Sequence, residues 1–100
     1  MLYAIICEEV PGALPRRMAV REAHLVRLHA LQDEGRLVLA GPHPLIDSEN
    51  PGPAGFSGSL IVAEFASREA ALAWASEEPY VNAGVFSSVT VKPFKKVFPA

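Results

Sequence analysis

The sequence predicts an α+β protein with ferredoxin-like topology, in which an antiparallel sheet of four strands carries two helices on one face. Three observations predict it. Four short runs are apolar or alternate between apolar and polar residues, as strands do. Two longer stretches have helical periodicity, and they separate these runs into the order βαββαβ. The length of 100 residues, half of them hydrophobic, suits a single domain over residues 1–100.

The first predicted strand is the unbroken apolar run Leu2–Cys7. Its brevity and the Pro11-Gly12 pair that follows it favour a strand buried on both faces over a helix, and we expect a central position in the sheet. Residues Glu8–Pro15 are then expected to form a loop.

The first predicted helix covers Val20–Gly35, with Gly35 placed as its C-terminal cap. At about 100° per residue, one narrow stripe of this helix contains Val20, His24, Leu28 and Leu31. His24 therefore points inward, at a position where leucine would be expected. His29 lies about 140° further round, on the polar side of the helix, so the two histidines share no face.

A second short strand, Arg36–Ala40, precedes a long segment of unusual composition. The segment Gly41–Gly58 contains four glycines and four prolines, which predicts irregular structure over most of its length. A loop of this length in a compact domain is usually functional or mobile, and the alternative is a hairpin connection without a role. The third predicted strand, Ser59–Phe65, is again largely apolar and looks buried on both faces.

The second predicted helix begins after Ser67, a good N-cap, and carries an apolar face of Ala70, Ala71, Trp74 and Ala75. Pro79 ends it, because proline disfavours helical geometry in the preceding Glu78. Residues Tyr80–Gly84 are predicted to be a short connection or one helical turn. The last strand is Val85–Lys92, which Pro93 ends, and Lys95-Lys96 and the terminal residues form a tail.

Two helices cover one face of the sheet only, although the first and third strands carry apolar side chains in both directions. Bare apolar sheet on a monomer would favour aggregation. We therefore expect a homodimer packed sheet to sheet, stable at micromolar concentration, and the sequence leaves further assembly open.

Composition narrows the function classes. A net charge of −2 provides no cationic field that would attract nucleic acid or anionic lipid, so we expect neither a nucleic acid nor a membrane as a partner. The longest wholly apolar run, Leu2–Cys7, is far shorter than the roughly 20 residues of a membrane helix. The single cysteine, Cys7, cannot form an internal disulfide, and no charged leader opens the chain, so a reducing cytoplasm is the expected location.

His24 is the leading candidate for chemistry, because imidazole titrates near neutral pH and can transfer a proton once a partner fixes its tautomer. The alternative is a core histidine bound to a backbone carbonyl. Glu77 and Glu78 lie at the end of a helix, where the macrodipole disfavours carboxylates. Glu77 is expected to be solvated, whereas Pro79 restrains the backbone of Glu78 and could aim its carboxylate at a neighbouring imidazole.

Tyr80 and Phe56 could form the walls of a pocket for a planar substrate, although such aromatics also serve simply in packing. His43 is expected at the surface of the loop. No metal site is predicted, because no two histidines are spaced as a ligand pair and no CxxC motif occurs. No phosphate-binding glycine loop or GxSxG motif occurs either, and buried Cys7 should be inert.

Several stretches together resemble the YciI-like protein family over nearly the whole chain: MLYAIICEE, REAHLVRLHALQDEGRL, AGPHPLID, the block from AGFSGSLIVAEF to EEPYVNAGVF, and VTVKPFKKVF. The resemblance implies a dimeric α+β barrel, related in fold to muconolactone isomerases, with an active-site histidine and aspartate near the sheet interface. The histidine corresponds to His24. The acid precedes proline in an Asp-Pro-aromatic motif, and here that position is Glu78 in Glu78-Pro79-Tyr80. Glutamate adds one methylene to the expected acid.

The resemblance further implies activity like that of lyases or dehydrochlorinases on hydroxylated ring compounds, without a metal or organic cofactor. Our first hypothesis is a small cytoplasmic enzyme in which Glu78 orients His24 for acid–base chemistry, of lyase, isomerase or dehydrochlorinase type, on a small substrate. Its pocket would lie between the first helix, the sheet and the loop that starts at Gly41 and Pro42, beside Phe56, Pro79 and Tyr80. The alternative is a non-catalytic dimeric module that binds a small ligand or a protein.

Overall fold

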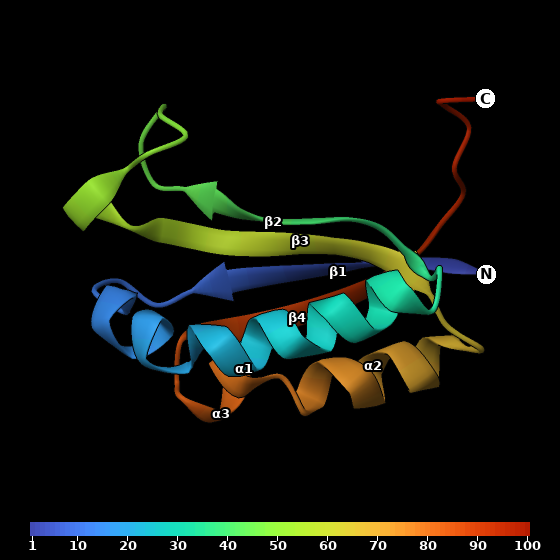
Figure 1. Cartoon of the computed structure of the whole chain (residues 1–100), viewed down its shortest axis with the longest axis horizontal. Coiled ribbons are helices and arrows are strands. Elements are labelled where there is room, and N and C mark those ends of the chain that lie inside the picture. The colour runs from blue at the N-terminus through green and yellow to red at the C-terminus, as the bar shows by residue number, and fades with distance from the viewer.

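The computed structural model describes residues 1–100 and shows a four-stranded antiparallel sheet with its helices on one face (Figure 1). The strand order is β2-β3-β1-β4, which confirms the predicted βαββαβ-like α+β fold and the central place of the first strand. The elements are β1 (Leu2–Glu9), α1 (Leu14–Asp33), β2 (Leu37–Pro44), the 3-10 turn η1 (Gly52–Ala54), β3 (Phe56–Glu64), α2 (Arg68–Ser76), α3 (Pro79–Asn82) and β4 (Phe86–Phe94).

Helix α1 begins at Leu14, six residues before the predicted start at Val20. Pro15 lies in its first turn, where a backbone N–H would have no helical partner, so the proline begins this helix instead of preceding it. At the other end, Gly35 adopts a left-handed φ of 72° and confirms the predicted cap. The buried residues of α1 are Arg17, His24 and Leu31.

The segment Gly41–Gly58 is more regular than its composition predicts. Strand β2 continues to Pro44 and β3 begins at Phe56, which leaves an irregular connection that is interrupted by η1. Prolines are tolerated because β2 is an edge strand, whose outer N–H groups need no partner in the sheet. The same reason explains why β4, the other edge, runs past Pro93 to Phe94. His43 is exposed, as predicted, but it belongs to β2 and not to a loop.

Gly58 is required by close packing of the two central strands. It pairs with Glu8 of β1, and a Cβ atom at position 58 would overlap the carbonyl oxygen of Cys7. Any side chain would force β1 and β3 apart at this point.

The second half of the chain follows the prediction closely. The side chain of Ser67 accepts a hydrogen bond from the backbone N–H of Ala70 at 3.0 Å and caps α2. Glu78 is extended, with φ −63° and ψ 129°, and separates α2 from the single turn of α3 that starts at Pro79.

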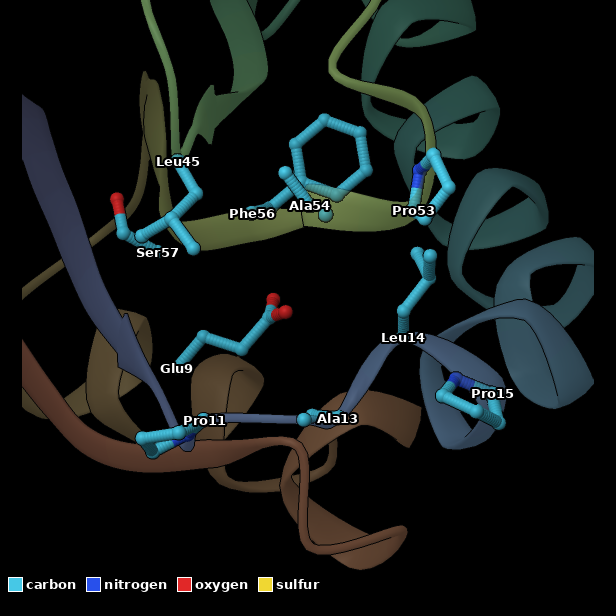
Figure 2. A pocket seen from close by; sticks show the side chains of 12 residues that line it. Glu9, Pro11, Ala13, Leu14, Pro15, Leu45, Pro53, Ala54, Phe56 and Ser57 are labelled. Carbon is cyan, nitrogen blue, oxygen red and sulfur yellow. The ribbon is translucent and has the colours of Figure 1, made fainter.

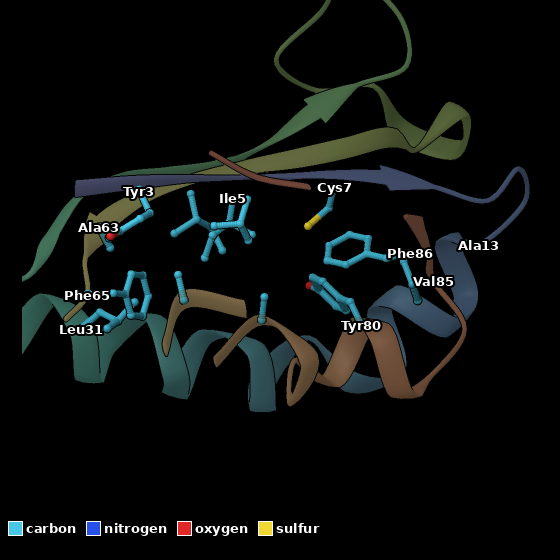
Figure 3. Packing of buried hydrophobic residues seen from close by; sticks show 14 residues of the cluster. Tyr3, Ile5, Cys7, Ala13, Leu31, Ala63, Phe65, Tyr80, Val85 and Phe86 are labelled. Atoms are coloured by element: carbon cyan, nitrogen blue, oxygen red, sulfur yellow. The ribbon is translucent and has the colours of Figure 1, made fainter. Parts of the chain in front are cut away.

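The hydrophobic core lies between the sheet and the helices (Figure 3). From β1 it receives the alternate side chains of Tyr3, Ile5 and Cys7, which meet Leu31 of α1 and the aromatic rings of Phe65 and Tyr80. No helix of the chain has both the length and the apolar character that crossing a bilayer demands.

The opposite face of the sheet carries no helix and remains apolar. Neighbouring side chains bury Ala4 and Val62 there, but Leu39 and Phe94 are 48% and 40% exposed. Large apolar side chains are therefore left in contact with solvent on this face.

Burial in the core raises the pKa of the Cys7 thiol from its usual 9.0 to about 11, and the charge of Glu78 acts in the same direction. Between these two values the unfolded chain loses the thiol proton while the folded chain keeps it. The free energy of unfolding should therefore fall as the pH rises from about 9 to about 11. Urea unfolding across this range should show a shallower fall in Cys7→Ala, and equal slopes in both proteins would contradict the prediction.

Candidate functional site

His24 lies on the inner face of α1 and is bonded through Nδ1 to Oε1 of Glu78. The two residues are 54 positions apart, and both are buried, with 8% and 2% of their surfaces exposed. Because Nδ1 is engaged by the carboxylate, Nε2 is the ring nitrogen that remains for another partner. The structure thus brings together the two residues that the sequence proposes as a pair.

The extra methylene of glutamate, relative to the family's aspartate, does not prevent this contact. The extended backbone of Glu78 before Pro79 ends α2 and turns the side chain towards α1. The backbone carbonyl of Glu78 accepts the N–H of Val81 at 2.9 Å and so begins α3. An extended Glu78 before Pro79 and a carboxylate bonded to His24 are thus both present, but Pro79 itself is not among the residues that line the cavity beside His24.

Arg27 completes the surroundings of the Glu78 carboxylate. Its Nη1 lies 2.9 Å from Oε2 of Glu78, and its Nη2 donates to the backbone carbonyl of Trp74 at 2.6 Å. The guanidinium carbon also lies 4.1 Å from the centroid of the Trp74 ring. Glu78 is therefore held from two sides, by an imidazole and by a guanidinium fixed against α2.

Tyr80 supports the imidazole from one face. The two ring centroids are 4.2 Å apart and the planes differ by 25°, so the rings stack. Phe86 packs edge-on against Tyr80, with centroids 5.4 Å apart. Burial raises the pKa of the Tyr80 hydroxyl, whereas the nearby charges of Arg17 and Arg21 act in the opposite direction.

A small cavity of about 170 Å³ opens beside His24. Among the residues predicted to bind substrate, Tyr80, Phe56 and Pro42 line it, whereas Gly41 and Pro79 do not. Gly41 pairs with Leu60 in the sheet. The full lining is Arg17, Met18, Arg21, His24, Leu25, Pro42, Phe56 and Tyr80.

Arg17 is a site residue that the sequence reasoning missed. Its guanidinium carbon lies 4.6 Å from the Phe56 centroid and 4.5 Å from the Tyr80 centroid, and its Nε is 3.6 Å from Oε1 of Glu9. Arg17, His24 and Leu31 are seven residues apart, which is two helical turns, so they share one face. Extending the stripe of His24 and Leu31 backwards by two turns would have found Arg17.

A second cavity, of about 520 Å³, lies between the β1–α1 connection and the segment before β3, and Glu9 is part of its lining (Figure 2). The Glu9 carboxylate points into it among Leu14, Leu45 and Phe56. The Glu9 side chain is 1% exposed, and its Oε1 has no hydrogen-bond partner. Burial raises the pKa of this carboxyl, and the charge of Arg17 opposes the rise.

The histidines and acids do not form a metal centre, since no three of the histidine, cysteine, aspartate and glutamate side chains gather in one place. His29 and His43 are both exposed, and neither lines the cavity beside His24. The site is therefore a buried imidazole–carboxylate pair beside a small cavity that is lined by aromatic rings and arginines.

These features define a class: an α+β protein of ferredoxin-like topology with a buried histidine–carboxylate pair between its helices and its sheet. A family model described as the YCII-related domain matches residues 1–95. The chain belongs to this family, as its sequence resemblance implied.

Two curated relatives support the assignment. Protein YciI of Escherichia coli O6:H1 is 58% identical over 98 residues, which are 98% of this chain and 100% of that protein. An uncharacterized protein of Haemophilus influenzae is 55% identical over the same shares of the two chains.

Among solved structures, 5-chloro-2-hydroxyhydroquinone dehydrochlorinase (TftG) from Burkholderia phenoliruptrix AC1100, in complex with 2,5-dihydroxybenzoquinone, has a TM-score of 0.83 and 25% identity. The match covers 95% of this chain and 94% of that one. Protein Atu4242 from Agrobacterium tumefaciens shares the fold at a TM-score of 0.53 and 17% identity, with 100% and 97% of the two chains covered.

The geometry of the pair predicts the tautomer of His24. A carboxylate at Nδ1 should hold the proton on that nitrogen and leave Nε2 unprotonated in the neutral ring. Nitrogen-15 NMR of labelled protein should show the Nδ1–H form for His24 and a mixture for exposed His29. In Glu78→Gln the preference of His24 should weaken, whereas in Glu77→Gln, at the exposed neighbouring position, it should persist. An Nε2–H form in the unaltered protein would contradict the pairing.

Proposed function

We propose that this protein is a small-molecule enzyme in which His24 transfers a proton through Nε2 while Glu78 orients the ring. The observation that carries the proposal is the buried Nδ1–Oε1 bond, which leaves one imidazole nitrogen free at the edge of a cavity. A histidine whose tautomer and position are fixed by a carboxylate is the arrangement that general acid–base catalysis needs. No step of this chemistry requires a metal or an organic cofactor.

The substrate class that suits the cavity is a small ring compound with hydroxyl groups. The cavity volume of about 170 Å³ accommodates a molecule of single-ring size, and Phe56, Tyr80 and Pro42 offer flat apolar walls to it. The dehydrochlorinase with the similar fold acts on a chlorinated, hydroxylated ring. By analogy, Nε2 would accept a proton from the substrate while chloride leaves with its bonding electron pair, so that HCl is lost overall.

We also propose that the working form is a cytoplasmic homodimer, joined by the open face of the sheet, which can assemble further. The support is the apolar character of this face, with Leu39 and Phe94 half exposed and no helix of the same chain to cover them. The exposed side chains of Val97 and Phe98 in the C-terminal tail add apolar surface beyond β4. Packing two such faces together removes this surface from water.

The catalytic proposal predicts a sharp dependence on His24. With 5-chloro-2-hydroxyhydroquinone and related chlorinated hydroxyaromatics as substrates, His24→Asn should lower kcat by about 10²–10⁴-fold, because the proton acceptor is lost. Glu78→Gln should cause a smaller loss, since the ring remains but its orientation is no longer fixed. Chloride release, followed with an ion-selective electrode, provides the measurement.

Two controls accompany these variants. Glu77→Gln and His29→Gln change exposed residues of the same types outside the cavity and should retain full activity. Turnover in His24→Asn at the rate of the unaltered protein would reject the catalytic role. Absence of turnover with the whole substrate series, together with tight binding of one of its members, would favour the non-catalytic binding module.

The dimer proposal predicts twice the mass of one chain by light scattering at micromolar concentration. Leu39→Lys should shift the protein towards the monomer, because it places a charge on the apolar face of the sheet that the two chains would share. Val26→Lys is the matched control, since Val26 is 66% exposed on α1, away from the sheet. A monomeric mass of the unaltered protein in this range would overturn the proposal.

A further inference from the structure

Arg17 is a buried cation whose hydrogen-bonding capacity the chain does not use. Its side chain is only 6% exposed, yet its single charged partner, Glu9, lies 3.6 Å from Nε, beyond a normal hydrogen bond. The rings of Phe56 and Tyr80 contact the guanidinium through their π faces and accept none of its five N–H groups in the ordinary way. Only Oε1 of Glu9 and Oγ of Ser59 are fully enclosed polar side-chain atoms without a partner, so the guanidinium nitrogens of Arg17 retain some access and can donate to an acceptor that arrives.

The cavity beside Arg17 is cationic. Its eight lining residues include Arg17, Arg21 and His24 but no aspartate or glutamate. Glu9 lines the larger cavity of about 520 Å³ and does not line the His24 cavity, so its carboxylate adds no negative charge to the wall of the His24 cavity. Burial raises the pKa of the Glu9 carboxyl, and the charge of Arg17 opposes the rise. A guanidinium whose one ion pair is too long for a normal hydrogen bond therefore faces the cavity from one side.

Arg17 and His24 also lie close together in space. Both contact the ring of Tyr80, Arg17 at 4.5 Å and His24 at 4.2 Å from its centroid, and both line the same cavity. A group bound by the guanidinium would therefore lie beside the imidazole, and one small molecule could contact both side chains.

We propose that Arg17, assisted by Arg21, binds a negatively charged oxygen of the substrate, so that the His24 cavity selects small planar anions such as carboxylates, phenolates or enolates. The inference rests on the proposed function in that it concerns the same cavity, but it makes a separate claim about charge. A guanidinium binds such an oxygen through short, charge-assisted hydrogen bonds. It would also stabilise negative charge that develops on a substrate oxygen as His24 removes a proton.

The test compares two probes of nearly equal shape, benzoate and benzamide, by calorimetric titration of the full chain at neutral pH. Benzoate should bind roughly tenfold or more tightly than benzamide, because only benzoate offers a charged acceptor to Arg17. Arg17→Met should abolish this preference. Arg16→Met is the matched control on the same helix, since Arg16 is exposed and outside the cavity, and it should keep the preference.

Glu9→Gln provides an arm of opposite sign that leaves Arg17 in place. Removing the carboxylate beside Arg17 should strengthen benzoate binding and leave benzamide unaffected, and this arm decides the matter if Arg17→Met fails to fold. Equal affinity for the two probes, failure of benzoate to bind up to its solubility limit, or weaker benzoate binding in Glu9→Gln would overturn the inference.

The failure of the inference and the failure of the proposed function give different results. Benzoate binding that depends on Arg17, in a protein that turns over no substrate, rejects catalysis and keeps the anion site. Turnover that depends on His24, in a protein that does not distinguish benzoate from benzamide, rejects the anion site and keeps catalysis.

Discussion

The burial of the Glu78 carboxylate is the constraint on which the site depends. Transfer of a carboxylate from water into a protein interior costs several kcal/mol unless charged or hydrogen-bonding partners replace the water. Both of its oxygens have such a partner, His24 at Oε1 and Arg27 at Oε2. Because Arg27 is itself bonded to Trp74 of α2, these polar contacts join α1, α2 and the start of α3. The same contacts that compensate the buried Glu78 carboxylate therefore also hold the His24 ring in place.

The core and the site are continuous, and both run along the same rows of side chains. On α1, the buried face passes from Leu31 through His24 to Arg17, two turns at a time. On β1, the inward-facing row that starts at Tyr3 ends at Glu9. Each row is apolar at one end of the molecule and charged at the other, and the two charged ends meet. The apolar ends of the two rows pack α1 against β1. This packing fixes the separation of Arg17 and Glu9 at the charged ends.

Much of this arrangement follows from the sequence, and the exceptions have physical causes. Periodicity and turn residues predicted the order of elements, the inward orientation of His24, the caps at Ser67 and Gly35, and the extended backbone of Glu78. The start of α1 was wrong because proline has opposite meanings in the first turn of a helix and in a loop. That error hid Arg17. Arg27 was missed for a different reason, since periodicity describes one element and its contacts with Glu78 and Trp74 cross between elements.

Gly58 shows that a site of this kind can be governed from a position with no functional group. Because Gly58 has no side chain, β3 can approach the backbone of Cys7 in β1. Glu9 lies two residues after Cys7 on β1. A methyl group at position 58 would displace the end of β1 that carries Glu9 and, through it, the charge that neighbours Arg17. In the proposed anion site, a substitution of Gly58 would thus alter ligand discrimination without contacting the ligand, and a survey restricted to acids, bases and nucleophiles would overlook it.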